Sequence, residues 1–150
     1  MELIIIRGRQ NDGKTTTATM LHNALVGQST VVRLLKINGD YLPVWQEVFD
    51  FRSVIDIGIT RVAIISAGDD DDVVAADMEA LLYEYRPDVL VVCARKYNRE
   101  GSTYRMLLEN YGDIMKSENE FWVENSEDPA KGKEAKQNVV EKIINKILNK

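Results

Sequence analysis

The chain has 150 residues, of which 45% are hydrophobic, so it is long enough to bury one core and is expected to form a single domain over residues 1–150. The net charge of −5 argues against a general nucleic-acid binder, because such proteins engage phosphates through a basic surface. The one cysteine, Cys93, lies in an apolar run and is expected to be a small buried side chain, which fits a reducing, cytoplasmic setting. No apolar stretch approaches the ~18 residues of a membrane span, so neither a membrane segment nor a signal segment is expected.

The opening stretch predicts a strand, a glycine loop and a helix. Residues 3–6, LIII, are typical of a short buried strand, and residues 15–26 have apolar side chains at helical spacing. Between them, Gly8-x-x-x-x-Gly13-Lys14-Thr15 matches the pattern G-x-x-x-x-G-K-[ST] in full. The N–H groups of residues 9–15 would form a nest for an anion, with the helix N-terminus adding partial positive charge behind them. The alternative is an ordinary glycine turn.

At this loop the sequence resembles the P-loop NTPases, and the resemblance covers the first ~40 residues well and the rest in outline. It implies binding of a nucleoside triphosphate, with ATP and Mg²⁺ as the expected cofactors. The residues expected to bind them are Gly8, Arg9, Gln10, Asn11, Asp12, Gly13, Lys14, Thr15 and Thr16. Lys14 would reach the β- and γ-phosphates during catalysis, and the Thr15 hydroxyl would be a magnesium ligand.

A second strand is predicted at residues 30–37, TVVRLLKI. The resulting β-α-β order predicts that this strand pairs in parallel with the first one, through a right-handed crossover. Asp40 would then face the same rim as the glycine loop, which makes it a candidate ligand of magnesium or of an acceptor substrate. Asn38-Gly39-Asp40 is also ordinary turn chemistry. Residues 41–50 predict a short helix with a proline in its first turn.

The next two extended runs, residues 51–57 and 61–66, are joined by Gly58-Ile59-Thr60. Such a connection is too short for a crossover, so an antiparallel hairpin and a mixed sheet are expected. The hairpin is comparable to the one ahead of the magnesium-binding motif of small GTPases.

Four acids follow this hairpin. In P-loop enzymes the strand beside the P-loop strand usually ends in an aspartate that orients magnesium, whereas here the run ends in Ser66 and the first acid is Asp69. Asp69, with Asp70, is a candidate for orienting magnesium-bound water or the nucleophile, and Ser66 for a polar contact. The alternative is that residues 69–72 cap and charge the first turn of the next helix.

A basic cluster follows the predicted central strand. Residues 74–85 predict a helix that ends before Pro87, and residues 88–94, DVLVVCA, predict a parallel strand covered on both faces. Residues 95–105 then contain three arginines and a lysine. The resemblance to nucleoside-monophosphate-kinase-like P-loop proteins implies that Arg95 and Arg99 clamp a phosphate during catalysis. The alternative is solvated loop charges that pair with the acids at 69–72.

The remaining predictions concern the nucleotide base and the C-terminal part of the chain. GTPases carry N-K-x-D after the corresponding strand, and residues 93–98, CARKYN, lack it, so ATP is expected rather than GTP. Residues 121–123 predict an edge strand, and residues 117–130 around them, with five acids and no basic residue, predict an acidic connecting loop. Residues 129–150 predict a closing helix whose apolar stripe is expected to pack in the core rather than against a partner, with its lysines facing water.

Together these patterns predict one α/β domain with a mixed, mostly parallel sheet and helices on both faces. The expected function is an ATP-dependent phosphotransferase resembling small nucleotide kinases, or an ATPase, with an unidentified small-molecule phosphate acceptor. The alternative is a nucleotide-binding switch or scaffold that hydrolyses slowly and acts through a protein partner, which the missing strand-end aspartate favours. Neither a membrane nor a nucleic-acid partner is expected.

Overall fold

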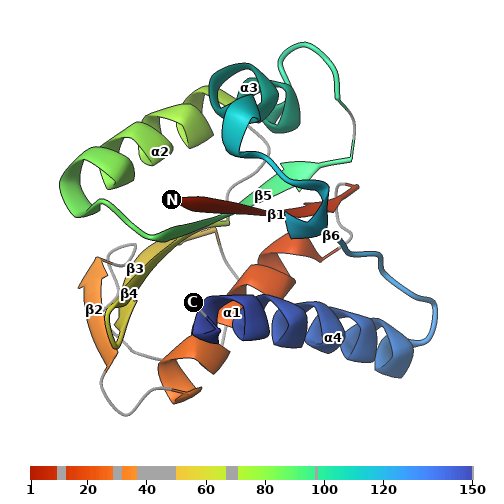
Figure 1. Cartoon of the computed structure of the whole chain (residues 1–150). Helices are drawn as coiled ribbons and strands as arrows, with labels where there is room; N and C mark the ends of the chain where they lie inside the picture. Colours follow the sequence, from red (N-terminus) through yellow and green to blue (C-terminus); the bar gives the residue numbers. More distant parts are fainter. Residues whose placement is uncertain (10–12, 29–31, 37–49, 67–70, 97, 150) are drawn as a thin grey trace.

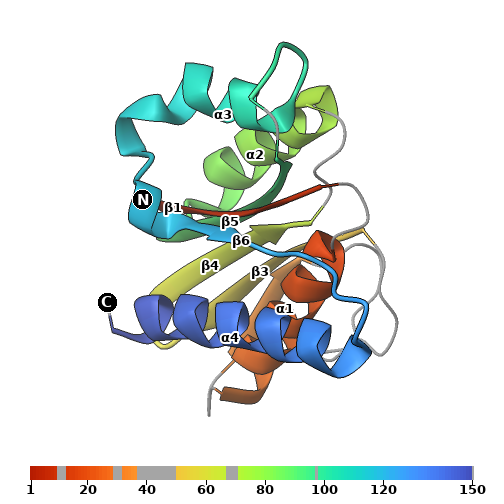
Figure 2. The same ribbon diagram turned by 90° about the vertical axis from the view of Figure 1, so that its right-hand side faces the viewer.

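The computed structural model describes residues 1–9, 13–28, 32–36, 50–66, 71–96 and 98–149, without the side chains of residues 28, 32–36 and 71–73. These residues form an α/β fold, in which a sheet lies between two helical layers (Figures 1 and 2). The strands are β1 (Glu2–Gly8), β2 (Val32–Lys36), β3 (Arg52–Ile57), β4 (Thr60–Ile65), β5 (Val89–Arg95) and β6 (Glu120–Trp122). The helices are α1 (Lys14–Gln28), α2 (Asp71–Tyr85), α3 (Thr103–Tyr111) and α4 (Pro129–Leu148), with short 3₁₀ turns η1 (Gly112–Ile114) and η2 (Ser117–Asn119).

The described strands have the order β2-β3-β4-β5-β1-β6. β1 pairs in parallel with β5 and β6, and β4 pairs in parallel with β5, whereas β3 runs antiparallel to both β2 and β4. The predicted mixed, mostly parallel sheet is therefore confirmed. The hairpin of β3 and β4, the central strand β5 and the edge strand β6 are confirmed as well.

One predicted pairing is wrong. β2 was expected beside β1, but it pairs with β3 at the far edge of the sheet. Both edges of β1 are occupied, one by β5, which is apolar from Val89 to Ala94, and the other by β6, so β1 has no edge left for β2. Consecutive strands are neighbours in only about two thirds of cases, and here the hairpin partner β3 offers the nearer edge. The helix predicted at residues 41–50 lies outside the described residues except for Asp50.

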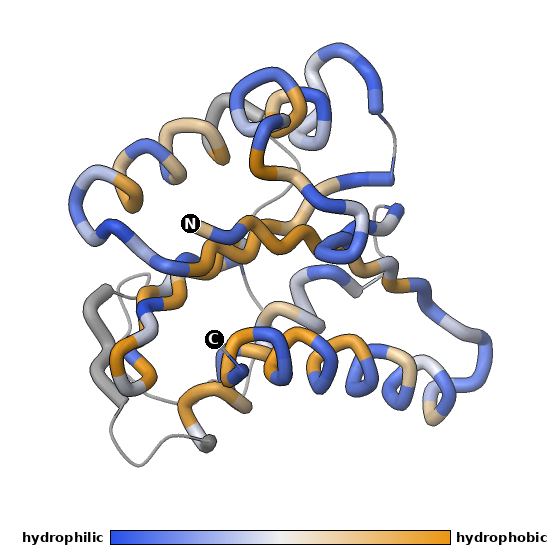
Figure 3. The backbone as a smooth tube through the Cα atoms, in the orientation of Figure 1, coloured by the Kyte–Doolittle hydropathy of each residue, from blue (hydrophilic) through white to orange (hydrophobic). Residues whose placement is uncertain are grey.

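The two faces of the sheet bury alternate residues of the strands. Leu3 and Ile5 of β1 pack with α2 and α3, whereas Ile4 and Ile6 pack with α1 and α4. This alternation is the two-residue period of a strand covered on both faces. Figure 3 shows the resulting hydrophobic centre of the sheet, and helices on both faces are confirmed (Figure 2).

Helix α4 closes the face that carries α1. The Asp128 carboxylate caps its start by accepting a hydrogen bond from the Ala130 N–H at 3.0 Å. Its stripe of Val140, Ile143, Ile144 and Ile147 is buried, so the prediction that the stripe packs in the core is confirmed. Leu148 remains 46% exposed, and Lys136 is buried against the expectation that the lysines of this helix face water. No helix in the described part of the chain is long and apolar enough to cross a membrane.

The topology brings several segments to one rim of the sheet. The carboxyl ends of β1, β5 and β6 lie side by side, with Gly8 opposite Arg95 and Arg7 opposite Trp122. Helix α1 starts at this rim because it follows β1 after a short loop. Since β3 runs against β4, its first residue also lies at the rim, directly after Asp50.

Candidate functional site

The loop between β1 and α1 turns the chain at two glycines. Gly8 is the last residue of β1, and Gly13 precedes Lys14, the first residue of α1. Gly13 has φ +89°, in the left-handed region where a side chain is strained. Residues 10–12, which include the predicted site residues Gln10, Asn11 and Asp12, lie outside the described residues.

The Lys14 ammonium folds back over the start of this loop. The side chain is only 7% exposed, and Nζ donates to the carbonyl oxygens of Arg9 at 2.8 Å and of Gly8 at 3.2 Å. A cation is thus fixed between the end of a central strand and the N-terminus of a helix. Both of these acceptors are neutral, and an anionic acceptor would bind the ammonium more strongly.

The threonines after Lys14 make different contacts, some within the helix and one at the rim of the sheet. The Thr17 hydroxyl bonds back to the Gly13 carbonyl at 2.8 Å, which secures the first turn of α1. The Thr15 hydroxyl instead reaches out of the helix to Asp50 Oδ1 at 3.4 Å. Thr16 is half-buried and lines a cavity beside the helix.

Asp50 is a candidate site residue that sequence reasoning missed. The available signal is its position directly before an antiparallel strand, because such a strand begins at the rim where the parallel strands end. Ser66, by contrast, has a structural contact: its hydroxyl accepts the Phe51 N–H at 2.6 Å and donates to the Phe51 carbonyl at 3.1 Å.

The strands beside β1 are β5 and β6, and β4 is not among them, so the interpretation of residues 64–69 as the end of the strand next to the P-loop strand is wrong. In β5, the residue opposite Gly8 is Arg95. Asp69 and Asp40, the acids predicted for magnesium, both lie outside the described residues. The predicted strand end was misplaced because β5, which comes later in the chain, inserts between β4 and β1.

The structure separates the two predicted arginines. Arg95 is half-buried and lies two residues after Cys93, on the same face of β5. The buried Cys93 thiol donates to the Lys14 carbonyl at 3.6 Å, so this face of β5 contacts the start of α1. Arg99 is exposed, and its backbone belongs to the turn that precedes α3, where the Ser102 hydroxyl accepts the Arg105 N–H at 3.1 Å as an N-cap. Arg95 is thus placed opposite Gly8, the first residue of the loop.

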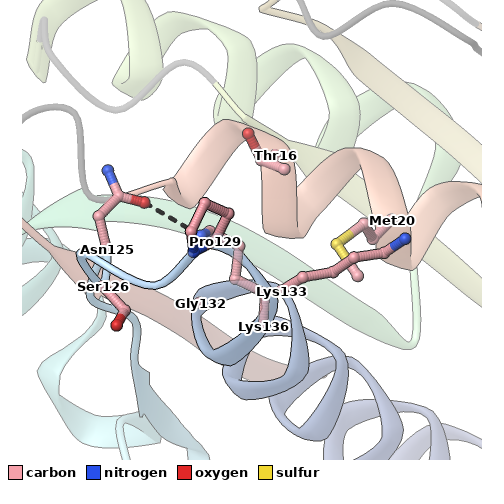
Figure 4. A pocket seen from close by; sticks show the side chains of 8 residues that line it. All are labelled: Thr16, Met20, Asn125, Ser126, Pro129, Gly132, Lys133 and Lys136. Atoms are coloured by element: carbon pink, nitrogen blue, oxygen red, sulfur yellow. Dashed lines mark hydrogen bonds between the residues drawn. The ribbon is translucent and has the colours of Figure 1, made fainter.

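A cavity of about 490 Å³ lies between α1 and the start of α4, next to the loop (Figure 4). Its lining residues are Thr16, Met20, Asn125, Ser126, Pro129, Gly132, Lys133 and Lys136. Within it, Lys136 Nζ donates to Asn125 Oδ1 at 3.0 Å. Sequence reasoning missed this cavity, since its walls come from two helices and a loop that are far apart in the chain.

Arg7 lies below the loop on the opposite face of the sheet. Its guanidinium stacks on Tyr104 at 3.5 Å and on Trp122 at 4.3 Å from the ring centres. It also donates to the Lys96 carbonyl and pairs with Glu120 at 3.4 Å. Burial, followed by the hydrogen bond and the charge of Glu120, raises the pKa of the Tyr104 phenol.

The described residues include no cluster of three or more His, Cys, Asp and Glu side chains that could hold a metal ion by themselves. Thr15 and Asp50 together offer one hydroxyl and one carboxylate at the rim. Comparisons of the chain with protein-family models, with curated proteins and with solved structures find no match.

Proposed function

We propose that this protein binds a nucleoside triphosphate, with ATP and Mg²⁺ as the expected pair, at the loop of residues 8–16, and transfers the γ-phosphoryl group to a small-molecule acceptor or to water. The observation that carries this proposal is the buried Lys14 ammonium, bound to the Gly8 and Arg9 carbonyls at the N-terminus of α1. The resemblance of this loop to the P-loop NTPases supports the same assignment. The proposal makes the protein a small P-loop phosphotransferase.

Phosphate binding at this loop follows from elementary electrostatics. The N-terminus of α1 carries a partial positive charge and unsatisfied N–H groups, and both favour an anion. A phosphate oxygen that replaced the neutral Gly8 and Arg9 carbonyls would form a charge-assisted bond with Lys14, which is about twice as strong as a neutral one. Gly13 adopts a φ of +89° at low cost, and successive N–H groups of such a turn can bind an anion.

Magnesium fits the two oxygen groups at the rim. Mg²⁺ usually binds through one or two protein oxygen ligands together with waters and substrate phosphates. Thr15 Oγ1 and Asp50 Oδ1, which are 3.4 Å apart, supply a hydroxyl and a carboxylate of that kind. We therefore assign to Asp50 the orienting role that the sequence suggested for Asp69. The roles of Asp69 and Asp40 stay sequence predictions.

The cavity beside Thr16 is where we place the nucleoside. Ligand pockets in proteins commonly measure about 300–1,000 Å³, so a volume of about 490 Å³ is suitable. Met20 and Pro129 provide apolar walls for a base, and Asn125 and Ser126 provide polar groups (Figure 4). Because Thr16 lines the cavity and directly follows the loop, a phosphate chain bound at the loop would lead into it.

Arg95 supports transfer rather than binding alone. It lies opposite Gly8 at the end of β5, on the face that contacts the start of α1. A permanently charged, planar guanidinium at that point could stabilise charge on the transferring phosphoryl group, where catalysis depends on positioning and electrostatics.

One observation favours the switch or scaffold as a second candidate. The strand next to β1 ends in Arg95 and not in a carboxylate, and the one described carboxylate at Thr15 belongs to Asp50, which is exposed. A metal held by an exposed carboxylate would be positioned less rigidly. Hydrolysis would then be slow, and the function would depend on a protein partner that reads the nucleotide state.

Calorimetric titration of ATP, with and without Mg²⁺, tests the proposal. Lys14→Ala should weaken ATP binding at least about tenfold, because it removes a charge-assisted contact of ~1.5–3 kcal/mol. Lys142→Ala, an exposed lysine of α4, is the matched control and should leave the affinity unchanged. Equally weak binding of ATP and GTP to wild type and to Lys14→Ala would mean that the loop is structural.

The phosphotransferase and the switch differ in turnover. Incubating the wild type with ATP, Mg²⁺ and a panel of nucleosides, nucleotides and other phosphate acceptors should yield a phosphorylated product from one of them. ATP binding without product from any acceptor, and with only slow release of inorganic phosphate, would favour the switch.

A further inference from the structure

Lys136 is a buried lysine in the second turn of α4. The residue is only 9% exposed, whereas the neighbouring lysines Lys131 and Lys133 are exposed. Within the described part of the chain, its ammonium has one hydrogen-bond acceptor, the amide oxygen of Asn125 at 3.0 Å, and no carboxylate pairs with it. An ammonium has three N–H donors, so one neutral acceptor satisfies it poorly.

The Lys136 side chain packs directly on the last glycine of the loop. A Cβ atom added to Gly13 would lie 2.1 Å from Lys136 Cε, 3.1 Å from Nζ and 3.3 Å from Asn125 Oδ1. The space that any other residue at position 13 would fill is therefore occupied by the lysine. Lys136 therefore contacts the loop at Gly13 and also lines the proposed nucleoside cavity, where Figure 4 shows its hydrogen bond with Asn125.

The place of Lys136 differs from that of Lys14. Lys14 lies at the start of the loop, on the carbonyls of Gly8 and Arg9, whereas Lys136 lies at its end, beside Gly13 and next to the cavity that Thr16 lines. A phosphate chain that ran from the nucleoside cavity into the loop would pass Lys136 first and Lys14 last.

We infer that Lys136 is a second phosphate-binding residue of the loop, and that its ammonium contacts the phosphates nearest the ribose. This inference rests on the proposed function and names its ligand class more closely: the contact serves nucleoside diphosphates and triphosphates alike, because it does not involve the γ-phosphate. The ligand supplies the anionic oxygens that the Asn125 amide alone does not. Asn125 then orients the lysine in the nucleotide-free protein.

The test compares two lysines of the same helix, one that lines the cavity and one that does not. Lys136→Met keeps the apolar stem and removes the charge, and Lys131→Met does the same at an exposed position outside the cavity. In calorimetric titrations, Lys136→Met should weaken ADP and ATP binding by similar factors of about tenfold or more. Lys131→Met should change both by less than about threefold. The affinity of Lys136→Met should also depend less on salt than that of the wild type.

A purely structural role of Lys136 predicts different results in these measurements. If Lys136 only supported Gly13, Lys136→Met would lower the unfolding temperature of the nucleotide-free protein and leave the salt dependence of binding as in the wild type. That result would overturn the inference, and so would unchanged affinity for ADP and ATP.

A second variant decides the matter without removing the lysine. Asn125→Asp places a carboxylate on Lys136, so the nucleotide-free protein should be as stable as the wild type or more so, while ADP binding weakens. Unchanged ADP binding in Asn125→Asp would overturn the inference. If the wild type itself bound neither ADP nor ATP, the proposed function would fail together with it, whereas wild-type binding with normal Lys136→Met affinity rejects Lys136 alone.

Discussion

Besides Lys14, two basic side chains near the glycine loop are buried among the described residues, one on each side of the sheet, and their surroundings differ. Arg7, on the face of α3, is 8% exposed and is stacked between Tyr104 and Trp122. It also pairs with Glu120 and donates to a backbone carbonyl. Lys136, on the face of α4, has the Asn125 amide as its one acceptor within the described residues.

The two cations differ in how far other groups of the protein compensate their charge. The contacts of Arg7 join the carboxyl ends of β1, β5 and β6, so its charge is compensated within the protein. Its Nε is buried without a hydrogen-bond partner in the described structure, but two aromatic faces surround the guanidinium. Among the described residues, Lys136 has no comparable compensation, and it borders a cavity. We therefore interpret Arg7 as a structural residue and propose Lys136 as a binding residue.

The largest expected effect concerns the stability of the α3 face. Arg7→Met should lower the free energy of unfolding by about 2–4 kcal/mol, because it removes a buried ion pair and two stacking contacts. Lys136→Met should change it by less than about 1 kcal/mol, since a buried charge whose one acceptor among the described residues is a neutral amide is replaced by an apolar side chain. Urea unfolding of both variants without nucleotide measures the difference. A larger loss of unfolding free energy in Lys136→Met than in Arg7→Met would mean that Lys136, and not Arg7, is the structural residue.

Substitutions at two glycines test how tightly Lys136 packs on the loop. Gly13 and Gly101 both have positive φ, +89° and +81°, but a Cβ on Gly101 meets no atom within 4 Å. Gly101→Ala should therefore cost only the backbone strain of about 1–2 kcal/mol. Gly13→Ala should cost at least about 1 kcal/mol more, because Lys136 must move.

A double variant checks the cause of that extra cost. Adding Lys136→Ala to Gly13→Ala should recover part of the lost stability, as expected for two residues in contact. Equal costs for the two glycine variants in urea unfolding would show that Lys136 yields freely and does not define the loop.

The next effect concerns Arg95, whose place opposite Gly8 puts it on the same face as α1. Lysine keeps the charge but loses the planar fork, so Arg95→Lys should lower turnover by about tenfold or more while the ATP dissociation constant changes by less than about threefold. Arg105→Lys, an exposed arginine of α3 that pairs with Glu109, is the matched control. Unchanged turnover in Arg95→Lys would assign the basic cluster to solvation or to partner binding.

The smallest effect concerns the base of the nucleotide, which we propose to lie in the cavity between α1 and α4. Because residues 93–98 lack N-K-x-D, GTP should have no advantage over ATP, and the two affinities should agree within about threefold. Parallel titrations under one buffer condition measure this. A tenfold preference for GTP would mean that other groups of the cavity, such as Asn125, read the guanine.

Local patterns predicted the elements well because each element obeys a short-range rule. The apolar runs of β1 and β5, the short connection between β3 and β4, and the helical spacing in α2 and α4 each depend on a few neighbouring residues. The loop from Gly8 to Thr15 was recognisable for the same reason. The groups that we predict to contact a phosphate there are backbone N–H groups and Lys14, so their spacing along the chain carries the information.

The order of strands was not predictable in this way. The sequence placed β2 beside β1 and the end of β4 beside the loop, whereas β5 and β6 occupy both edges of β1. Strand order depends on which apolar surfaces compete for the same edge, and that competition involves the whole chain. This misplacement also explains why Asp50 was not expected at the site.

The sequence by itself determined the strand–loop–helix unit of residues 2–28, the α/β class and the basic residue Arg95 after a central strand. Only the tertiary structure decided that Asp50 reaches Thr15, that Arg95 faces Gly8, and that Lys136 packs on Gly13. The physical reason is the distance along the chain. A loop that binds through its own backbone is encoded locally, but side chains more than thirty positions away reach it only once the sheet is ordered and the helices are packed.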